Sequence, residues 1–175
     1  ASAMQRAGRP VVALDLDPQN ALQHHFKARV GVGSCSALGI AHAEQDWHVC
    51  GMPSDSGVFV LPYGDIDEVR RLDFEQQLSI TPDWLAQRLA AMDLEEGAVV
   101  FIDTPPGPSI YLRQALSVAN EAVVVSLADA ASYTALPRIE GLIQAYSAGR
   151  KSFMGTTYLI NQVDEARKLS RNITC

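Results

Sequence analysis

One apolar run that ends in an acidic residue constrains the fold of this chain more than any other feature. It reads Val99-Val-Phe-Ile-Asp-Thr-Pro-Pro-Gly107. An uninterrupted run of this kind is typical of a strand that is buried on both faces of a parallel sheet. Open α/β folds bind their ligands at the carboxyl edge of such a sheet, so we expect Asp103 to lie at a binding site.

A carboxylate at that edge is a natural ligand for Mg²⁺, either directly or through water. Gly107 would let the backbone approach whatever the metal holds. The other interpretation is that Asp103 only caps a turn or the next helix. Spacing alone leaves the two interpretations equally open, because strands that end in Asp are common in α/β folds.

A second apolar run near the N-terminus also ends in acids. In Val11-Val-Ala-Leu-Asp-Leu-Asp-Pro-Gln19, Asp15 and Asp17 follow the apolar residues and Pro18 would stop the sheet ladder. We predict five strands in all, at 11–16, 58–62, 99–103, 122–127 and 156–161. The connections are long enough for right-handed crossovers. The pattern predicts a doubly wound α/β fold, with a mostly parallel sheet and helices on both faces.

Helical patterns are expected between these strands. The first residues resemble the last turns of a helix with Gly8 at its C-cap. Thr81 and Pro82 are expected to open a helix that packs on the sheet. Further helices are predicted at 22–30, 34–43, 109–119, 132–148 (interrupted or opened at Pro137) and from 164 onwards. Segment 46–57 is expected to be irregular, and 68–77 to be a charged, mobile surface segment.

The chain has 175 residues, which is the size of one domain with a real core. Its formal net charge of −6 gives no support for a basic nucleic-acid-binding surface. No apolar run approaches the roughly 20 residues that cross a bilayer. Three cysteines without metal-type spacing, and no visible signal peptide, favour free thiols in a reducing cytoplasm.

Four polar residues are therefore expected at strand ends, namely Asp15, Asp17, Asp103 and Asn161. At one edge of the sheet they would hold Mg²⁺ and orient a water for phosphoryl transfer. An Asp-nucleophile phosphatase fits Asp15 and Asp17, but it has Thr where this chain has Gln19. A phospho-acceptor receiver domain would have Lys in place of Asn161. A nucleotide-hydrolysing switch protein would use the acids for water and metal and the Asn for the base.

Three motifs in this order resemble the MinD/ParA family of deviant-Walker ATPases: Asp15-Leu-Asp-Pro-Gln19, Asp103-Thr-Pro-Pro-Gly107 and Ile160-Asn161. Other residues resemble one branch of that family, the BcsQ (YhjQ) proteins of cellulose biosynthesis. These are Asp46-Trp47, Val58-Phe-Val-Leu-Pro-Tyr-Gly64 and Thr104-Pro-Pro-Gly-Pro-Ser109. The resemblance covers essentially the whole chain and implies a P-loop NTPase-like fold.

The resemblance implies roles for the three aspartates. Asp17 would position or polarise the attacking water, with Asp15 near the metal. Asp103 would be the Walker B acid, which binds Mg²⁺ mainly through water.

The resemblance also implies nucleotide contacts. Four residues would form the loop called switch II: Thr104, Pro105, Pro106 and Gly107. Gly107 would lie near the γ-phosphate. Asn161 would hydrogen-bond the adenine, and Asp164 is a second candidate for the base site.

For the protein as a whole, the resemblance implies ATP and Mg²⁺ as cofactors and a homodimer with ATP between the subunits. Slow hydrolysis would reset the dimer. The expected partners are components of the cellulose synthase complex, with no nucleic acid. The expected location is the cytoplasm. Recruitment to the inner membrane or cell pole, by peripheral membrane association, is compatible with this location.

The chain departs from the family pattern at the phosphate loop. That Gly-rich loop follows the first strand, its N–H groups cradle the phosphates, and its lysines neutralise them. Since the chain begins in what resembles the later half of the next helix, we expect a single domain, residues 1–175, truncated at both ends and lacking the loop. We expect these residues to bind ATP weakly or not at all, to be inactive alone and to expose unpaired strand edges.

Two alternatives to an ATP-dependent switch stay open at this point. One is a non-catalytic adaptor that keeps the ATPase-like fold for partner binding. The other is the Asp-nucleophile phosphatase, for which Asp15 would be the nucleophile.

Overall fold

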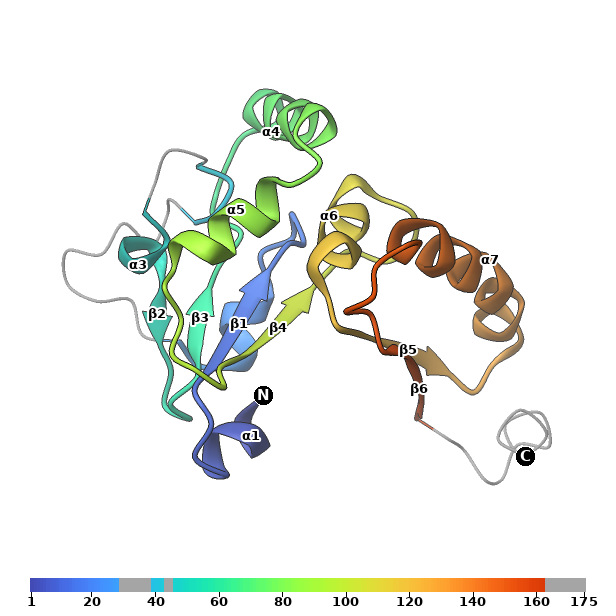
Figure 1. Ribbon diagram of the computed structural model, residues 1–175, viewed down its shortest axis with the longest axis horizontal. Helices are drawn as coiled ribbons and strands as arrows, with labels where there is room; N and C mark the ends of the chain where they lie inside the picture. Colours follow the sequence, from blue (N-terminus) through green and yellow to red (C-terminus); the bar gives the residue numbers. More distant parts are fainter. Residues whose placement is uncertain (29–38, 43–45, 163–175) are drawn as a thin grey trace. The chain divides into compact units, whose positions relative to one another are not determined.

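The computed structural model describes residues 1–28, 39–42 and 46–162, and the chain divides into two compact units, Ala1–Ala115 and Leu116–Cys175 (Figure 1). The prediction of an α/β fold with mostly parallel strands is confirmed. Each unit has its own sheet, and strands alternate with helices along the chain. That residues 1–175 form one continuous domain stays a prediction.

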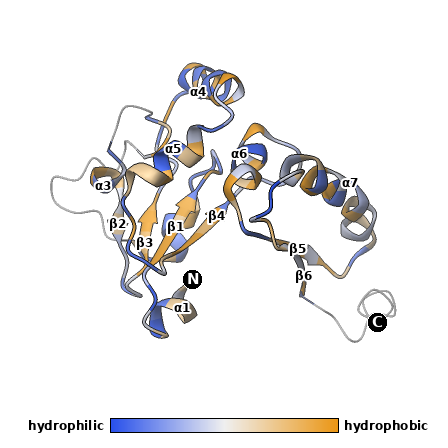
Figure 2. Ribbon diagram, viewed as in Figure 1, coloured by the Kyte–Doolittle hydropathy of each residue, from blue (hydrophilic) through white to orange (hydrophobic). Residues whose placement is uncertain are grey.

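The first unit is built on a four-stranded sheet in the order β2-β3-β1-β4. Its strands are β1 (Val11–Asp15), β2 (Met52–Pro53), β3 (Phe59–Leu61) and β4 (Val99–Asp103). β1 pairs in parallel with both β3 and β4, and β2 is antiparallel to β3. β1, β3 and β4 are among the most hydrophobic segments of this unit in Figure 2, which explains why they form its interior.

Helices accompany this sheet. Their bounds are α1 (Ser2–Arg6), α2 (Leu22–His25), α3 (Trp47–Cys50), α4 (Glu68–Ile80), α5 (Trp84–Ala91) and α6 (Ile110–Val118), which runs on into the second unit. Leu22 and Phe26 pack against a buried cluster formed by Val11, Ala13, Val58 and Val60. Figure 1 shows α5 crossing in front of the sheet.

A cluster of five buried aromatic side chains joins α3, α4, α5 and α6 to the end of β3. Its members are Trp47, Tyr63, Phe74, Trp84 and Tyr111. The closest ring centroids, those of Phe74 and Trp84, are 5.2 Å apart in an edge-to-face arrangement. Such pairs add about 0.5–1.5 kcal/mol beyond the burial of their area, so the cluster fixes the helices relative to the strand.

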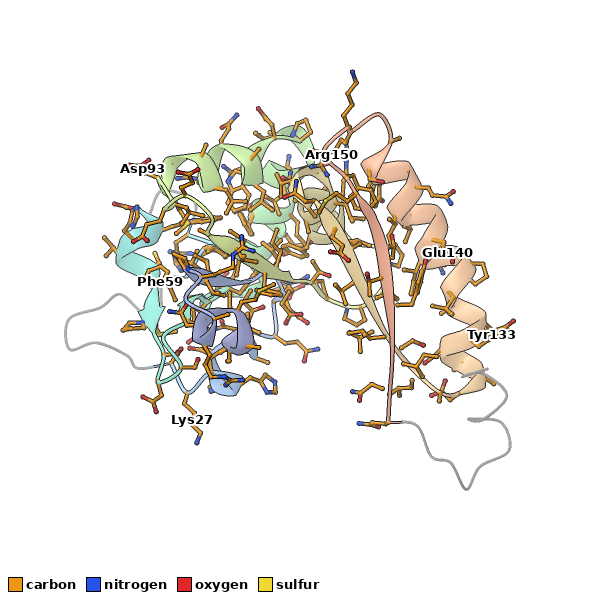
Figure 3. All side chains as sticks on the ribbon, turned by 60° about the horizontal axis from the view of Figure 1, so that its bottom comes forward. Lys27, Phe59, Asp93, Tyr133, Glu140 and Arg150 are labelled. Carbon is orange, nitrogen blue, oxygen red and sulfur yellow. The ribbon has the colours of Figure 1, made fainter. Side chains whose placement is uncertain are left out.

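The described residues of the second unit, up to 162, form two parallel strands and one long helix. β5 (Glu121–Leu127) pairs along its length with β6 (Gly155–Asn161), and α7 (Ala130–Ser147) carries Tyr133 and Glu140, both labelled in Figure 3. Arg150 donates from Nη1 to the carbonyl oxygens of Leu116 and Ala119, each at 2.7 Å. This Arg therefore satisfies carbonyl groups at the end of α6.

The segment 68–77, predicted to be mobile, is instead part of the regular helix α4. Asp67 caps it, since its Oδ1 accepts the backbone N–H of Arg70 at 2.8 Å. Phe74 and Leu78 are buried four residues apart on one face. The prediction was wrong because the charges between them hide this short apolar stripe.

Other boundaries also differ from the predictions. Thr81 ends α4 rather than opening α5, and its carbonyl oxygen accepts the N–H of Trp84. α7 starts earlier than predicted because Asp129 caps it, and it runs through Pro137 without interruption. Segment 46–57 contains α3 and β2. The predicted helices at 34–43 and from 164 onwards lie wholly or mainly outside the described residues.

β4 is not buried on both faces as predicted. In the part of the chain that the structure describes, its one strand neighbour is β1, and Phe101 is 38% exposed. No helix among the described residues has the length and apolar character needed to span a bilayer.

Candidate functional site

Asp15 ends β1 and is fully buried. Its Oδ1 accepts the N–H of Asp17 at 2.9 Å, and its Oδ2 accepts the N–H of Leu22 at 3.0 Å. Burial raises the pKa of Asp15 to about 6; the two backbone hydrogen bonds lower it, and the charges of Asp103 and Asp17 raise it. Asp15 therefore does cap the following turn, in addition to contributing charge to this edge.

Asp17 lies just beyond β1 and is half-buried. Its Oδ1 accepts the N–H of Gln19 at 2.9 Å, and its carbonyl oxygen accepts the N–H of Asn20. Asn20 adopts a φ of +51°, a left-handed conformation that Asn tolerates better than most residues. This tight turn holds the Asp17 carboxylate at the carboxyl edge of the sheet.

Asp103 ends β4 and is the register partner of Asp15. The N–H of Leu16 donates to the carbonyl oxygen of Asp103 at 2.9 Å, which ties the two strand ends together. Asp103 is exposed, yet the protein atoms around it remove enough water to raise its pKa, and the charge of Asp17 raises it further. The three aspartates predicted at strand ends in this unit therefore share one edge of the sheet.

Asp15, Asp17 and Asp103 together form the aspartate rim, a candidate site for Mg²⁺. Among the described residues, no three acidic, His or Cys side chains are arranged to hold a metal ion by themselves. Mg²⁺ commonly keeps several waters and binds through one or two carboxylates plus substrate phosphates. The neighbouring negative charges raise the pKa of Asp15 and of Asp103, and a divalent cation would relieve this repulsion, so the rim fits Mg²⁺ held mainly through water and phosphate.

The predicted switch loop follows β4 directly. The N–H of Thr104 hydrogen-bonds the Asp103 carboxylate and lowers its pKa, against the larger effect of burial. Pro105 is half-buried and Pro106 exposed. Gly107 has a φ of +82°, and no atom lies within 4 Å of the position that a Cβ would take. The backbone conformation, rather than a close protein neighbour, therefore explains the glycine.

Asn161 ends β6 and is exposed, as predicted for a strand-end amide. Its Oδ1 accepts the N–H of Gln162 at 2.9 Å. Asn161 belongs to the second unit, so its proximity to the aspartate rim stays a prediction. Asp164 lies outside the described residues.

Sequence reasoning missed two tyrosines near this edge. Tyr63 follows β3 and Tyr111 lies in the first turn of α6, and their hydroxyl oxygens are 2.8 Å apart. The one signal in the sequence was the position of Tyr63 within the 58–64 motif, since no local pattern pairs residues 48 positions apart.

The raised pKa of Asp15 predicts a pH-dependent stability. Since its folded pKa of about 6 exceeds the ordinary 3.8, the native state binds this proton more tightly than the unfolded state does. The free energy of unfolding should therefore fall by up to about 3 kcal/mol as pH rises from about 4 to 6, and then stay level. Urea unfolding in metal-free buffer, compared with Asp15→Asn, measures this contribution. Parallel pH profiles for the two proteins would contradict it.

The family model of the cellulose biosynthesis protein BcsQ matches residues 1–174. The chain belongs to the BcsQ family. The resemblance of the motifs to BcsQ and to ParA/MinD-type ATPases is thereby confirmed. No curated protein matches the chain by sequence.

Solved structures agree with this assignment at the level of the fold. Cobyrinic acid a,c-diamide synthase from Mycobacterium smegmatis, with a bound ATP analog and magnesium, superposes with a TM-score of 0.78 at 19% identity, over 99% of this chain and 70% of that chain. A plasmid partition protein from Borrelia burgdorferi gives 0.72 at 14% identity, over 98% and 73%. Apo McdA from Cyanothece gives 0.74 at 16% identity, over 99% and 70%. This BcsQ-family chain therefore has the P-loop NTPase-like fold of ParA/MinD proteins.

Proposed function

We propose that this chain is the main part of an ATPase that uses Mg²⁺-ATP to switch between monomer and dimer in bacterial cellulose biosynthesis. One observation carries the proposal: Asp15 and Asp103 are opposite each other at the ends of paired strands, with Asp17 in the adjoining turn. A ParA-like fold with acids at this edge has the chemistry that phosphoryl transfer needs.

Each aspartate contributes differently in this proposal. Asp103 is exposed and would hold Mg²⁺ through water. Buried Asp15 keeps the β1 turn in place and adds negative charge near the metal. Asp17, half-buried in the turn, would accept a hydrogen bond from the attacking water. The metal, when bound, would neutralise the phosphate oxygens.

Several fold relatives support the choice of ligand. The cobyrinic acid a,c-diamide synthase has been solved with ADP and magnesium, and a McdA variant from Cyanothece as an ATP complex. We extend these ligands to this chain as part of the proposal. In this proposal the γ-phosphate orders the switch loop, which consists of Thr104, Pro105, Pro106 and Gly107. The adenine is contacted by Asn161 and Asp164.

The remaining parts of the proposal follow the family. The active form would be a homodimer in the cytoplasm, recruited to the inner membrane or cell pole by components of the cellulose synthase complex. The signal it passes on would be a change of conformation rather than a chemical product.

One observation favours a second candidate, the non-catalytic adaptor. Both carboxylate oxygens of Asp15 accept backbone N–H groups, which turn capping alone explains. The phosphatase alternative loses support because Asp15 is fully buried, whereas a nucleophilic carboxylate has to reach its substrate.

Sedimentation of the full-length protein separates the switch from the adaptor. We expect dimers with Mg²⁺-ATP and monomers with ADP or without nucleotide, because only the γ-phosphate would order the switch loop. Equal dimerisation in all three conditions would contradict the switch and favour the adaptor. Turnover of a simple phosphomonoester that Asp15→Asn abolishes would instead revive the phosphatase.

A further inference from the structure

Two buried tyrosines and a glutamate form a chain of hydrogen bonds in the first unit. Tyr63 and Tyr111 are 1% and 3% exposed. Their hydroxyl oxygens are 2.8 Å apart, and the hydroxyl of Tyr111 donates to Oε1 of Glu75 at 3.1 Å. Arg71 donates to the same carboxylate oxygen at 2.8 Å and forms an ion pair with Glu75.

The direction of this chain follows from the chemistry of its end. An ionised carboxylate only accepts hydrogen bonds, so the single hydroxyl proton of Tyr111 goes to Glu75. Tyr63 must then donate its proton to Tyr111. The donors and acceptors therefore run from Tyr63 to Tyr111 to Glu75. Each hydroxyl donates its single proton to the next group in the chain.

Tyr63 lies beyond the end of β3, at the edge of the sheet that carries the aspartate rim. Tyr63 comes two residues after Leu61, the register partner of Leu14, so it follows β3 at the same edge as the aspartate rim. Burial raises the pKa of Tyr63 to about 12, and the charge of Asp17 is close enough to contribute to that rise.

Tyr111 stands at the far end of the switch loop. The loop leaves β4 after Asp103 and enters α6 at Ile110, with Ser109 Oγ accepting the N–H of Leu112 at 3.0 Å. One end of the loop is fixed by the pairing of β4 with β1. The other end is fixed by the hydroxyl pair, which ties the first turn of α6 to the end of β3.

We propose that the hydrogen bond from Tyr63 to Tyr111 is a strut that sets the position of the switch loop, residues 104–107, through the start of α6. Both tyrosines are then positioning residues for the hydrolysis described above. The effect on catalysis rests on the proposed function. The effect on the position of the loop depends only on the hydrogen bond between the two tyrosines. Neither tyrosine touches the reacting atoms in this scheme; each acts through the loop.

The two halves of the pair should respond unequally to removal of a hydroxyl. Tyr63→Phe removes only the hydrogen bond between the two tyrosines and leaves Tyr111 hydrogen-bonded to Glu75. Tyr111→Phe breaks both bonds and leaves the buried hydroxyl of Tyr63 without an acceptor, which is the more costly change. The double variant should be less destabilised than Tyr111→Phe, because it also removes the Tyr63 hydroxyl that Tyr111→Phe leaves without an acceptor.

Hydrogen exchange in the full-length protein without nucleotide tests the strut. We expect amides within 104–112 to exchange about 5-fold faster in Tyr63→Phe and faster still in Tyr111→Phe, the factor that the loss of one modest hydrogen bond produces. Exchange in β1 should stay as in the unaltered protein. Tyr158→Phe is the control, since it removes a tyrosine hydroxyl that donates to Glu140 at 3.0 Å within the second unit.

A second readout connects the strut to catalysis. The rate of hydrolysis at saturating Mg²⁺-ATP should fall about 5-fold in Tyr63→Phe while the dissociation constant for ATP changes less than about 2-fold. Faster exchange throughout the first unit, unchanged exchange at 104–112, or an unchanged rate despite a looser loop would each overturn the proposal. If the unaltered protein hydrolyses no ATP, the proposed function fails, and the exchange experiment still decides the strut.

Discussion

Replacing Asp17 with alanine is expected to slow ATP hydrolysis by the full-length protein about 100-fold or more, with ATP affinity changed less than about 2-fold. Positioned acid–base groups typically contribute factors of 10² to 10⁴. Asp17 is half-buried at the carboxyl edge of the sheet, where it can accept a hydrogen bond from water without being the main ligand of the nucleotide. Single-turnover kinetics and equilibrium ATP binding measure the two quantities separately.

A more conservative variant removes a structural ambiguity from this experiment. Asp17→Ala also loses the bond that Oδ1 accepts from the N–H of Gln19, whereas Asp17→Asn can keep that bond and lacks only the charge. We expect Asp17→Asn to be nearly as slow as Asp17→Ala. Asp46→Asn is the matched control, since Asp46 is exposed and makes the same bond to the N–H two residues later as the N-cap of α3. Loss of ATP binding, or a normal rate in Asp17→Asn, would contradict the role assigned to Asp17.

The second large effect is expected from Gln114→Leu, which should lower the free energy of unfolding by about 3–5 kcal/mol. Gln114 is 1% exposed on α6. Its Oε1 accepts the N–H of Leu85, and its Nε2 donates to the carbonyl oxygens of Leu78 and Thr81 at 2.9 and 2.8 Å. One amide thus serves the end of α4 and the start of α5. Leucine leaves two buried backbone groups and one part-buried backbone group without this partner, at about 1–3 kcal/mol for each buried group before relaxation.

Urea unfolding of Gln114→Leu measures this effect, with Gln87→Leu as its control. Gln87 is exposed and donates to Asp83 in the same region, so its loss should cost less than about 1 kcal/mol. A cost below about 1 kcal/mol for Gln114→Leu would show that the amide does not hold these helix ends together.

The strands that carry the aspartate rim could be predicted from the sequence because their signals are local. Val11–Asp15 and Val99–Asp103 are apolar runs that each end in an acid, and parallel topology alone brings their ends to one edge. The same reasoning predicted Asn161 at the end of β6. The two hydrogen bonds that Asp15 accepts depend on how the β1 turn folds back toward Leu22, which no local pattern shows.

Features that depend on tertiary contacts could not be predicted in this way. α4 was missed because only Phe74 and Leu78 mark its buried face, among charged neighbours. β2 is two residues long and exists through its antiparallel pairing with β3. The bond between Tyr63 and Tyr111 and the three bonds of Gln114 join residues at least 29 positions apart, where periodicity carries no information.

The central claim is that the aspartate rim seats Mg²⁺ together with a nucleotide. Calorimetric titration of the full-length protein with ATP, in Mg²⁺ and in EDTA, tests it most directly when Asp103→Asn is measured beside it. We predict that Mg²⁺ tightens ATP binding about 10-fold in the unaltered protein and that Asp103→Asn removes this dependence while still binding ATP. ATP binding that is absent, or whose dependence on Mg²⁺ survives in Asp103→Asn, would contradict the claim.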